Sequence, residues 1–140
     1  MRPAIATLIL LAMSATASPL AADVIHDAVI DGKLVVVKGL IEANPKLVEK
    51  ADDQQLLPLH YAALTGKTEI AKYLVVKKAD VEAKTKTGYT SLHLAATGGH
   101  AGVVKWLLAG KADVNATDAK KYTPLHHAVE GRYVEIIGLL

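Results

Sequence analysis

The sequence contains no cysteine and no phenylalanine, and aromatic residues of all kinds make up only 4% of it. Without cysteine, disulfide bridges, zinc–thiolate sites and thiol catalysis are all excluded. Without phenylalanine, the core must be built from Ala, Leu, Val and Ile. A core rich in alanine lets backbones approach closely, so this composition favours helices packed on helices.

The chain also lacks an excess of either charge, because 16 Lys and Arg residues stand against 14 Asp and Glu residues, for a formal net charge of +2. This near balance gives no electrostatic reason to expect nucleic acid as a partner. Hydrophobic residues form 51% of the chain, which is too many for a disordered protein. The length of 140 residues fits one compact domain.

The first 17 residues have the three-part layout of a secretory signal peptide. Arg2 precedes an apolar run, Ala4–Met13, and small residues then lead to a cleavage site before Ser18. This run is too short for a membrane span, which needs about 20 residues. A short buried helix and cleavage after Ala22 are the alternatives. We predict a signal peptide over 1–17, export to a periplasm or the extracellular space, and no membrane segment in the mature form.

A four-residue pattern close to Thr-Pro-Leu-His recurs with a spacing of 33 residues. Its copies are Leu57–His60, Thr90–His93 and Thr123–His126. Each is followed by alanines and apolar pairs at matching offsets, and a fainter copy anchored on His26 lies upstream. The pattern therefore predicts a repeat domain over 18–140. Its repeats are approximately 24–56, 57–89, 90–122 and 123–140, the last of them truncated.

The residues of one repeat predict two helices joined by a turn. Thr123 is a natural N-cap, a proline follows at the first helical position, and His126 can reach back to the cap. In the third repeat, Gly98-Gly99 ends the first helix, because glycine can take the positive φ of a tight reversal. A second helix is predicted over 101–108, and a hairpin-like loop follows it. One such unit cannot bury its own apolar stripe, so neighbouring units must stack.

These features resemble the ankyrin-repeat family. The resemblance rests on the Thr-Pro-Leu-His starts, on Gly99-His100, and on the Ala-Asp-Val-Asn-Ala run at 112–116 with its variant at 79–83. It covers about 24–140. It implies an all-α repeat solenoid, an open stack of helix-turn-helix units with projecting β-hairpin-like loops. It also implies that another protein binds through the loop tips and the first-helix face.

Three positions depart from this family pattern. Leu57 replaces the capping threonine, and Ser91 replaces the proline. Arg132 occupies a turn position held by glycine in the two preceding repeats, so we expect either a strained residue or a turn shifted to Gly131. Because the last repeat stops at Leu140 with an apolar end, we also expect that the array continues or that this chain is a fragment.

The six histidines raise the question of a metal site, but their positions favour helix capping. His60, His93 and His126 share one register, where each can cap its own helix start, whereas a metal needs ligands that converge. His126 and His127 are expected to point apart on a helix. No serine or acidic pair forms a catalytic arrangement. We therefore predict no metal, no cofactor and no enzymatic activity.

The candidate partner-binding residues lie where the repeat does not dictate the side chain. Just before each helix start, one register holds Leu56, Tyr89 and Tyr122, with Lys86 and Lys120 nearby. Tyrosine is large, stiff and polar at its tip, which suits an interface. Alternatively, these rings only cover the base of the hairpin, and the site is on the first-helix face. That face carries Leu64, Thr97 and Glu130.

Trp106 falls on the second-helix stripe and is predicted to pack in the core. The function that these features favour is a monomeric, exported, non-enzymatic module that binds another protein. Two alternatives remain open: a secreted effector that engages host proteins, and an enzyme or metal-dependent protein built on a repeat frame.

Overall fold

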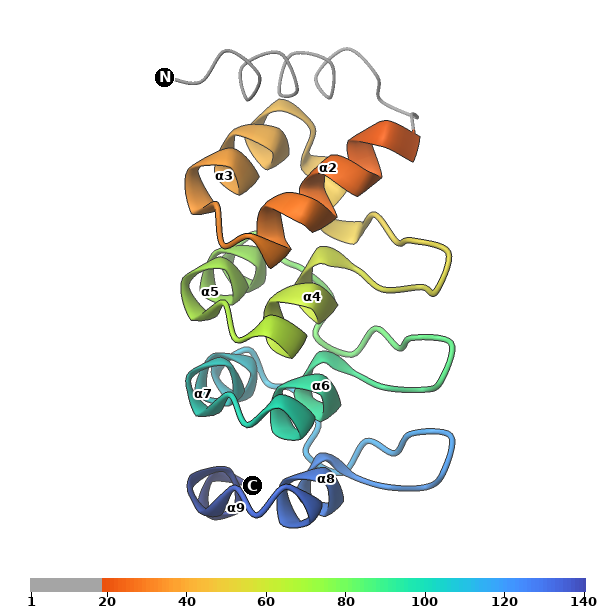
Figure 1. Ribbon diagram of the computed structural model, residues 1–140, viewed down its shortest axis with the longest axis vertical. Coiled ribbons are helices and arrows are strands. Elements are labelled where there is room, and N and C mark those ends of the chain that lie inside the picture. The colour runs from red at the N-terminus through yellow and green to blue at the C-terminus, as the bar shows by residue number, and fades with distance from the viewer. Residues whose placement is uncertain (1–18) are drawn as a thin grey trace.

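The computed structural model describes residues 19–140 as a stack of helix pairs (Figure 1). The predicted signal peptide, 1–17, lies outside these residues. The first helices of the pairs are α2 (Pro19–Ile30), α4 (Pro58–Thr65), α6 (Ser91–Gly98) and α8 (Pro124–Glu130). The second helices are α3 (Leu34–Ala43), α5 (Thr68–Val76), α7 (Ala101–Ala109) and α9 (Val134–Leu139).

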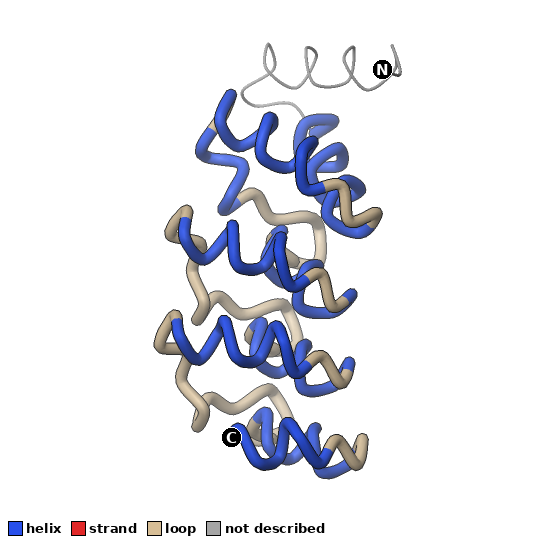
Figure 2. Tube along the Cα trace, turned by 90° about the vertical axis from the view of Figure 1, so that its left-hand side faces the viewer, coloured by secondary structure: helices blue, strands red, loops and turns tan. Residues whose placement is uncertain are grey.

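First and second helices form two layers, and loops project from one side of the stack (Figure 1). A quarter turn away, successive pairs repeat the same arrangement (Figure 2). A 3₁₀ helix, η1 (Pro45–Glu49), follows the first pair. Between residues 19 and 140 there is no strand, and none of the helices there has the length and hydrophobicity of a membrane-spanning segment. The fold is the all-helical repeat stack that the sequence predicts.

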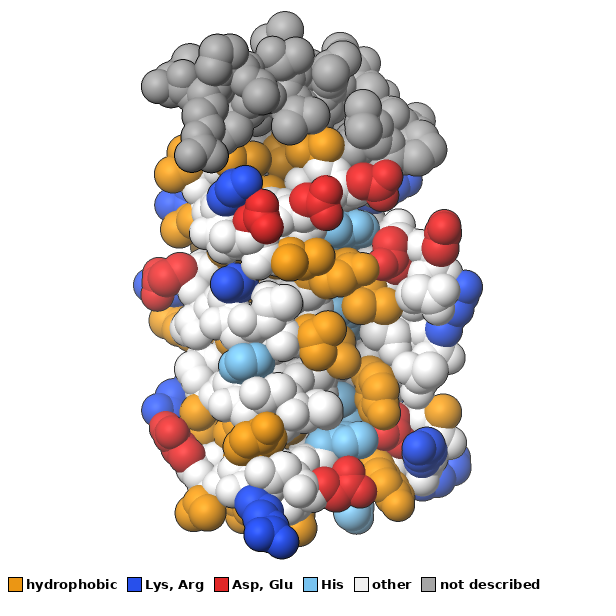
Figure 3. Space-filling view, in the orientation of Figure 1, with side chains coloured by type: hydrophobic (Ala, Val, Ile, Leu, Met, Phe, Trp, Pro, Cys, Tyr) orange, Lys and Arg blue, Asp and Glu red, His pale blue; other side chains and the backbone are white. Residues whose placement is uncertain are grey.

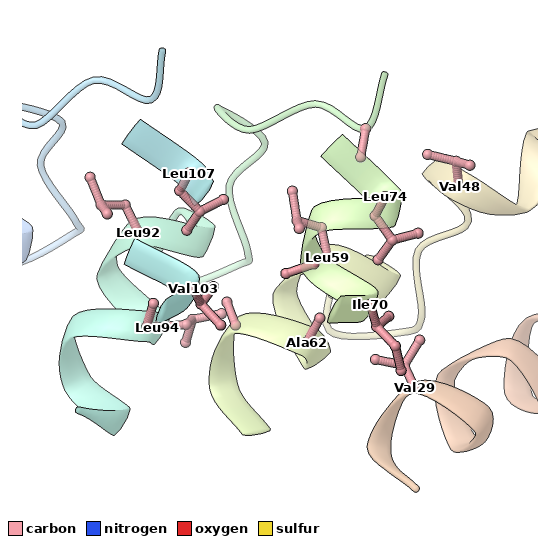
Figure 4. Close-up of a cluster of buried hydrophobic side chains, with 14 of the residues drawn as sticks. Val29, Val48, Leu59, Ala62, Ile70, Leu74, Leu92, Leu94, Val103 and Leu107 are labelled. Atoms are coloured by element: carbon pink, nitrogen blue, oxygen red, sulfur yellow. The ribbon is translucent and has the colours of Figure 1, made fainter. Parts of the chain in front are cut away.

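The core runs along the stack, between the two layers and between successive pairs (Figure 4). Leu59 and Leu92, at one register of α4 and α6, are fully buried, and so are Leu74 and Leu107 of the second helices. Small side chains on α4 and α6 let neighbouring first helices approach closely. The fully buried ones are Ala62, Ala63, Ala95 and Ala96.

Trp106 does not join this core, and the prediction that it would is wrong. Its ring is half-buried at the surface of α7, with the Lys72 ammonium 4.8 Å from the ring centroid. One repeat earlier, Lys38 lies over Tyr73 in the same way, at 5.5 Å. Trp106 follows the helical stripe as a neighbour of buried Leu107, but one step along a helix turns a side chain by about 100°, which is enough to leave the core.

A histidine near the start of α4, α6 and α8 caps its own helix. In each case Nδ1 accepts a hydrogen bond from the backbone N–H three residues earlier, at 2.9, 3.1 and 3.0 Å. The three residues are His60, His93 and His126, and their predicted capping role is confirmed. The opposite nitrogen reaches the chain that follows the second helix of the same repeat: His60 Nε2 donates to the Ala83 carbonyl at 2.9 Å, and His93 Nε2 to the Tyr122 carbonyl at 3.0 Å.

The turn of the last repeat does not shift by one residue. Arg132 itself has a φ of 58°, whereas Gly131 has a φ of −77°. At the same place one repeat earlier, Gly99 has a φ of 75° and lies against the Tyr133 ring, where a Cβ atom would clash. Arg132 is exposed, so its side chain fits and only the backbone strain applies.

Candidate interaction surface

Three hairpin loops project from the stack, and the side chain at the start of each loop holds its shape. They are hairpin 1, residues 52–56, hairpin 2, residues 85–89, and hairpin 3, residues 118–122. Asp52 Oδ1 accepts hydrogen bonds from the backbone N–H groups of Gln54 and Leu56, at 2.8 and 2.9 Å. Asp118 holds hairpin 3 in the same way, and Thr85 holds hairpin 2. Backbone hydrogen bonds of 3.3 and 3.2 Å join successive loops, so the tips form one continuous edge.

The row of residues predicted before the helix starts lies at the junction of hairpins and first helices. Leu56 and Tyr89 are half-buried there, and Tyr122 is 39% exposed. The Tyr89 ring packs edge-on against His127, with 5.4 Å between centroids, so this ring does cover the base of the hairpin. The Tyr122 ring stacks on His126 at 5.3 Å and is the more accessible of the two.

The other predicted set lies on the first helices and adjoins this row. Leu64 is 41% exposed, and Thr97 and Glu130 are also exposed. Ile30 of α2, which is 40% exposed, belongs to the same register, and its spacing of 34 from Leu64 could have indicated it. In Figure 3, hydrophobic and histidine side chains gather between the first helices and the loops. We call this band, formed by the first-helix set with Ile30 and by the row of Leu56, Tyr89 and Tyr122, the groove. Lys86 and Lys120 are exposed on its hairpin side.

Two hairpin aspartates also bind the first helix nine residues farther along the chain. Asp52 Oδ2 accepts a hydrogen bond from the Tyr61 hydroxyl, and Asp118 Oδ2 accepts one from His127 Nε2 at 2.8 Å. Asp118 and His127 are only 4% and 8% exposed. His126 and His127 therefore have different hydrogen-bond partners, Thr123 and Asp118, although their ring centroids lie 5.3 and 5.9 Å from that of the Tyr122 ring. The shared spacing of nine residues is the signal in the sequence that sequence reasoning missed.

Burial and charge shift the pKa values of groups along the groove. Burial, the hydrogen bond to Asp52 and nearby carboxylates raise the pKa of the Tyr61 hydroxyl to about 12. These carboxylates are Asp52, Asp27 and Asp23. Burial alone would raise the pKa of Asp118, but hydrogen bonds from His127 and from backbone N–H groups outweigh it and hold that pKa below its usual value. The carboxylates that raise the pKa of Tyr61 lie at the α2 end of the groove.

The opposite end of the groove opens into a shallow, mostly apolar hollow of about 340 Å³. It is lined by Tyr122, Leu125, His126, Val129 and Glu130. Across residues 19–140, no three His, Asp or Glu side chains are grouped to hold a metal ion. What the groove offers is contact chemistry: aromatic rings, exposed aliphatic side chains and charges.

Comparison with known proteins agrees with the geometry. The family described as ankyrin repeats (3 copies) matches residues 7–85, 25–118 and 77–140. Over 53 residues, the chain is also 40% identical to alpha-latrocrustotoxin-Lt1a of Latrodectus tredecimguttatus. That stretch covers 38% of this chain and 4% of the toxin, so the similarity to the toxin is local. The family matches together span nearly the whole sequence, and the chain belongs to the ankyrin-repeat family.

Proposed function

We propose that this chain is an exported, non-enzymatic module that binds another protein in the groove. Ankyrin repeats as a family are protein–protein interaction modules, and the export and the location of the site are our additions. The observation that carries the proposal is the series of exposed apolar side chains along the groove. Ile30, Leu64 and Tyr122 are 40%, 41% and 39% exposed. Together with the mostly apolar hollow beside Tyr122, these side chains give this face the exposed apolar character of an interaction site.

The groove is held in shape before any partner arrives. His93 fixes hairpin 3 to α6 through the Tyr122 carbonyl, and hairpin 3 is bonded in turn to hairpin 2. A preorganised surface loses little conformational entropy on binding. Tyrosine rings at such a surface carry a large share of the binding energy, so we assign the strongest single contact to Tyr122.

Export is supported by the layout of residues 1–17, which lie outside the described part of the chain. A second candidate function, a secreted effector that engages host proteins, is favoured by the local similarity to a protein named as a toxin. Both functions use the same groove. They differ in the organism that supplies the partner.

The test compares a variant of the groove with a matched control variant in the layer of second helices. Leu64→Glu/Tyr122→Ala changes the groove, and Val35→Glu/Val76→Ala makes equivalent changes at exposed positions of α3 and α5. A partner recovered with the wild type is titrated against all three proteins by calorimetry. We expect the groove variant to bind at least about tenfold more weakly and the control to bind normally, with unchanged melting of both. Unchanged affinity of the groove variant would refute the proposal.

A further inference from the structure

The groove carries opposite charges at its two ends. Three exposed carboxylates lie on α2 and hairpin 1, and three exposed ammonium groups lie on hairpins 2 and 3. The first group is Asp23, Asp27 and Asp53, and the second is Lys86, Lys120 and Lys121. Figure 3 shows a group of acidic side chains over the upper part of this face, lysines at the edge of the lower loops, and separate acidic side chains lower on the face.

The chain itself does not neutralise the acidic end. Within residues 19–140, none of the three aspartates forms an ion pair. Asp23 and Asp27 lie one turn apart on α2, which packs against α4, and their charges contribute to the raised pKa of Tyr61. Asp52, which is hydrogen-bonded to the same tyrosine, adds a further negative charge at this place.

The basic end is equally uncompensated in the described part of the chain. Lys86, Lys120 and Lys121 form no ion pair there. The acid within hairpin 3, Asp118, is buried, and its oxygens accept hydrogen bonds from hairpin N–H groups and from His127. Glu130, on the helix side of the groove, lies 3.8 Å from the ring of the same histidine. The lysines therefore present positive charge along the hairpin edge.

The exposed apolar side chains of the groove lie between and beside these charged ends. A polyanion such as nucleic acid would meet the aspartates, and a uniformly basic segment would meet the lysines. An occupant whose own charge changes sign along its length can place a positive group against the aspartates and a negative group against the lysines. Such complementarity fixes the direction and register of binding more than it adds affinity.

We propose that the groove binds an extended protein segment with basic residues at one end, apolar residues in the middle and acidic residues at the other end. The basic end lies against α2 and hairpin 1, and the acidic end lies along hairpins 2 and 3. This inference rests on the proposed function and adds the charge pattern of the partner and its direction.

The probes for the test are two synthetic peptides of identical composition, each with Leu and Trp at its centre. In the block peptide, lysines stand at one end and glutamates at the other, and in the alternating peptide the two residue types are mixed. We expect the block peptide to bind the full chain at least about tenfold more tightly at low ionic strength, with the difference shrinking as salt is added.

Two matched charge variants locate the effect. Lys86→Glu/Lys120→Glu reverses the hairpin charge and should remove the preference for the block peptide. Lys78→Glu/Lys111→Glu makes the same change in net charge at exposed lysines that follow the second helices, and it should keep the preference. Direction is read by NMR with a spin label on either end of the block peptide. A label on the glutamate end should broaden the amide signal of Tyr122, and one on the lysine end should broaden that of Asp27.

Equal affinity for the two peptides, including no binding of either, would overturn the inference, and so would the reverse orientation. If both peptides bind equally but binding is lost in Leu64→Glu/Tyr122→Ala, the charge pattern fails while the proposed function stands. If the recovered partner itself ignores that groove variant, the proposed function fails. A salt-sensitive dimer abolished by Lys86→Glu/Lys120→Glu would assign the groove to a second copy and would also overturn the inference.

Discussion

Asp118 fastens hairpin 3 to α8 through His127. The carboxylate oxygen Oδ2 lies 2.8 Å from Nε2 of the imidazole, and both side chains are almost completely buried. The other carboxylate oxygen accepts backbone N–H groups of the hairpin. One side chain therefore shapes the loop and anchors it to the helix behind it.

Replacing Asp118 alone should lower the free energy of unfolding more than replacing Asp118 and His127 together. Hairpin 2 and α6 have Thr85 and Leu94 at the corresponding positions, and Leu94 is buried. Asp118→Thr alone leaves a buried imidazole without its acceptor, and we expect a loss of about 3 kcal/mol in the free energy of unfolding. Adding His127→Leu should recover a large part of that loss. Denaturant unfolding of the two single variants and the double variant gives the coupling energy, and strictly additive effects would contradict the prediction.

Ser91→Pro should stabilise the protein. Ser91 is fully buried at the first position of α6, its hydroxyl has no hydrogen-bond partner within the described residues, and α4 and α8 begin with proline. The substitution removes an unsatisfied hydroxyl and restricts the unfolded chain, so we expect a gain of about 1 kcal/mol. Ser91→Ala, which removes only the hydroxyl, is the control and should gain less. A lower melting temperature for the proline variant would show that the position does not accept the ring.

Stability should fall as the pH drops below about 6.5. Burial lowers the pKa values of His60 and His93 from 6.5, so the folded protein keeps both imidazoles neutral where the unfolded chain takes up protons. The free energy of unfolding then decreases with falling pH until the lowered pKa values are passed, by up to about 1.4 kcal/mol per pH unit for each histidine. Above pH 6.5 the two groups contribute no pH dependence. Urea unfolding at a series of pH values checks the sign, and a flat profile would contradict it.

The two tyrosines of the groove should separate stability from binding. Because the Tyr89 ring packs on His93 and His127, Tyr89→Ala should lower the free energy of unfolding by about 1 kcal/mol or more. Truncating the more exposed Tyr122 to alanine should lower the free energy of unfolding less than Tyr89→Ala does, and should weaken binding to a recovered partner more. Thermal melts and calorimetric titration of the two variants test this, and equal losses of stability would refute it.

Export predicts that the mature chain lacks the first 17 residues. Intact mass spectrometry of the protein recovered from the host's exported fraction should show Ser18 as the first residue. A protein that retains Met1, or that is absent from this fraction, would contradict export.

The sequence was sufficient for what is local and repeated, and insufficient for what depends on a neighbouring repeat. Caps, turns and helix order follow from residues within one unit, so the capping by His93 could be predicted from its place after Thr90. The contacts of Tyr89 with His127 join different repeats, and nothing in one unit specifies them. Trp106 is half-buried because its position on α7 lies one step, about 100°, from that of buried Leu107, and its ring meets Lys72 of the preceding repeat. Arg132 could be identified as strained, but only the backbone shows that it carries the strain itself.

The backbone hydrogen bonds between successive hairpins have a thermodynamic consequence. The bond from the Lys86 N–H to the Gln54 carbonyl, and the bond from the Ala119 N–H to the Thr87 carbonyl, exist only while two successive repeats are both folded. Each bond contributes about 1 kcal/mol to the free energy of unfolding. Because it joins two repeats, it stabilises only the state in which both of them are folded. Such nearest-neighbour terms penalise every boundary between folded and unfolded repeats. They lengthen the stretch of the stack that opens and closes as a single cooperative unit.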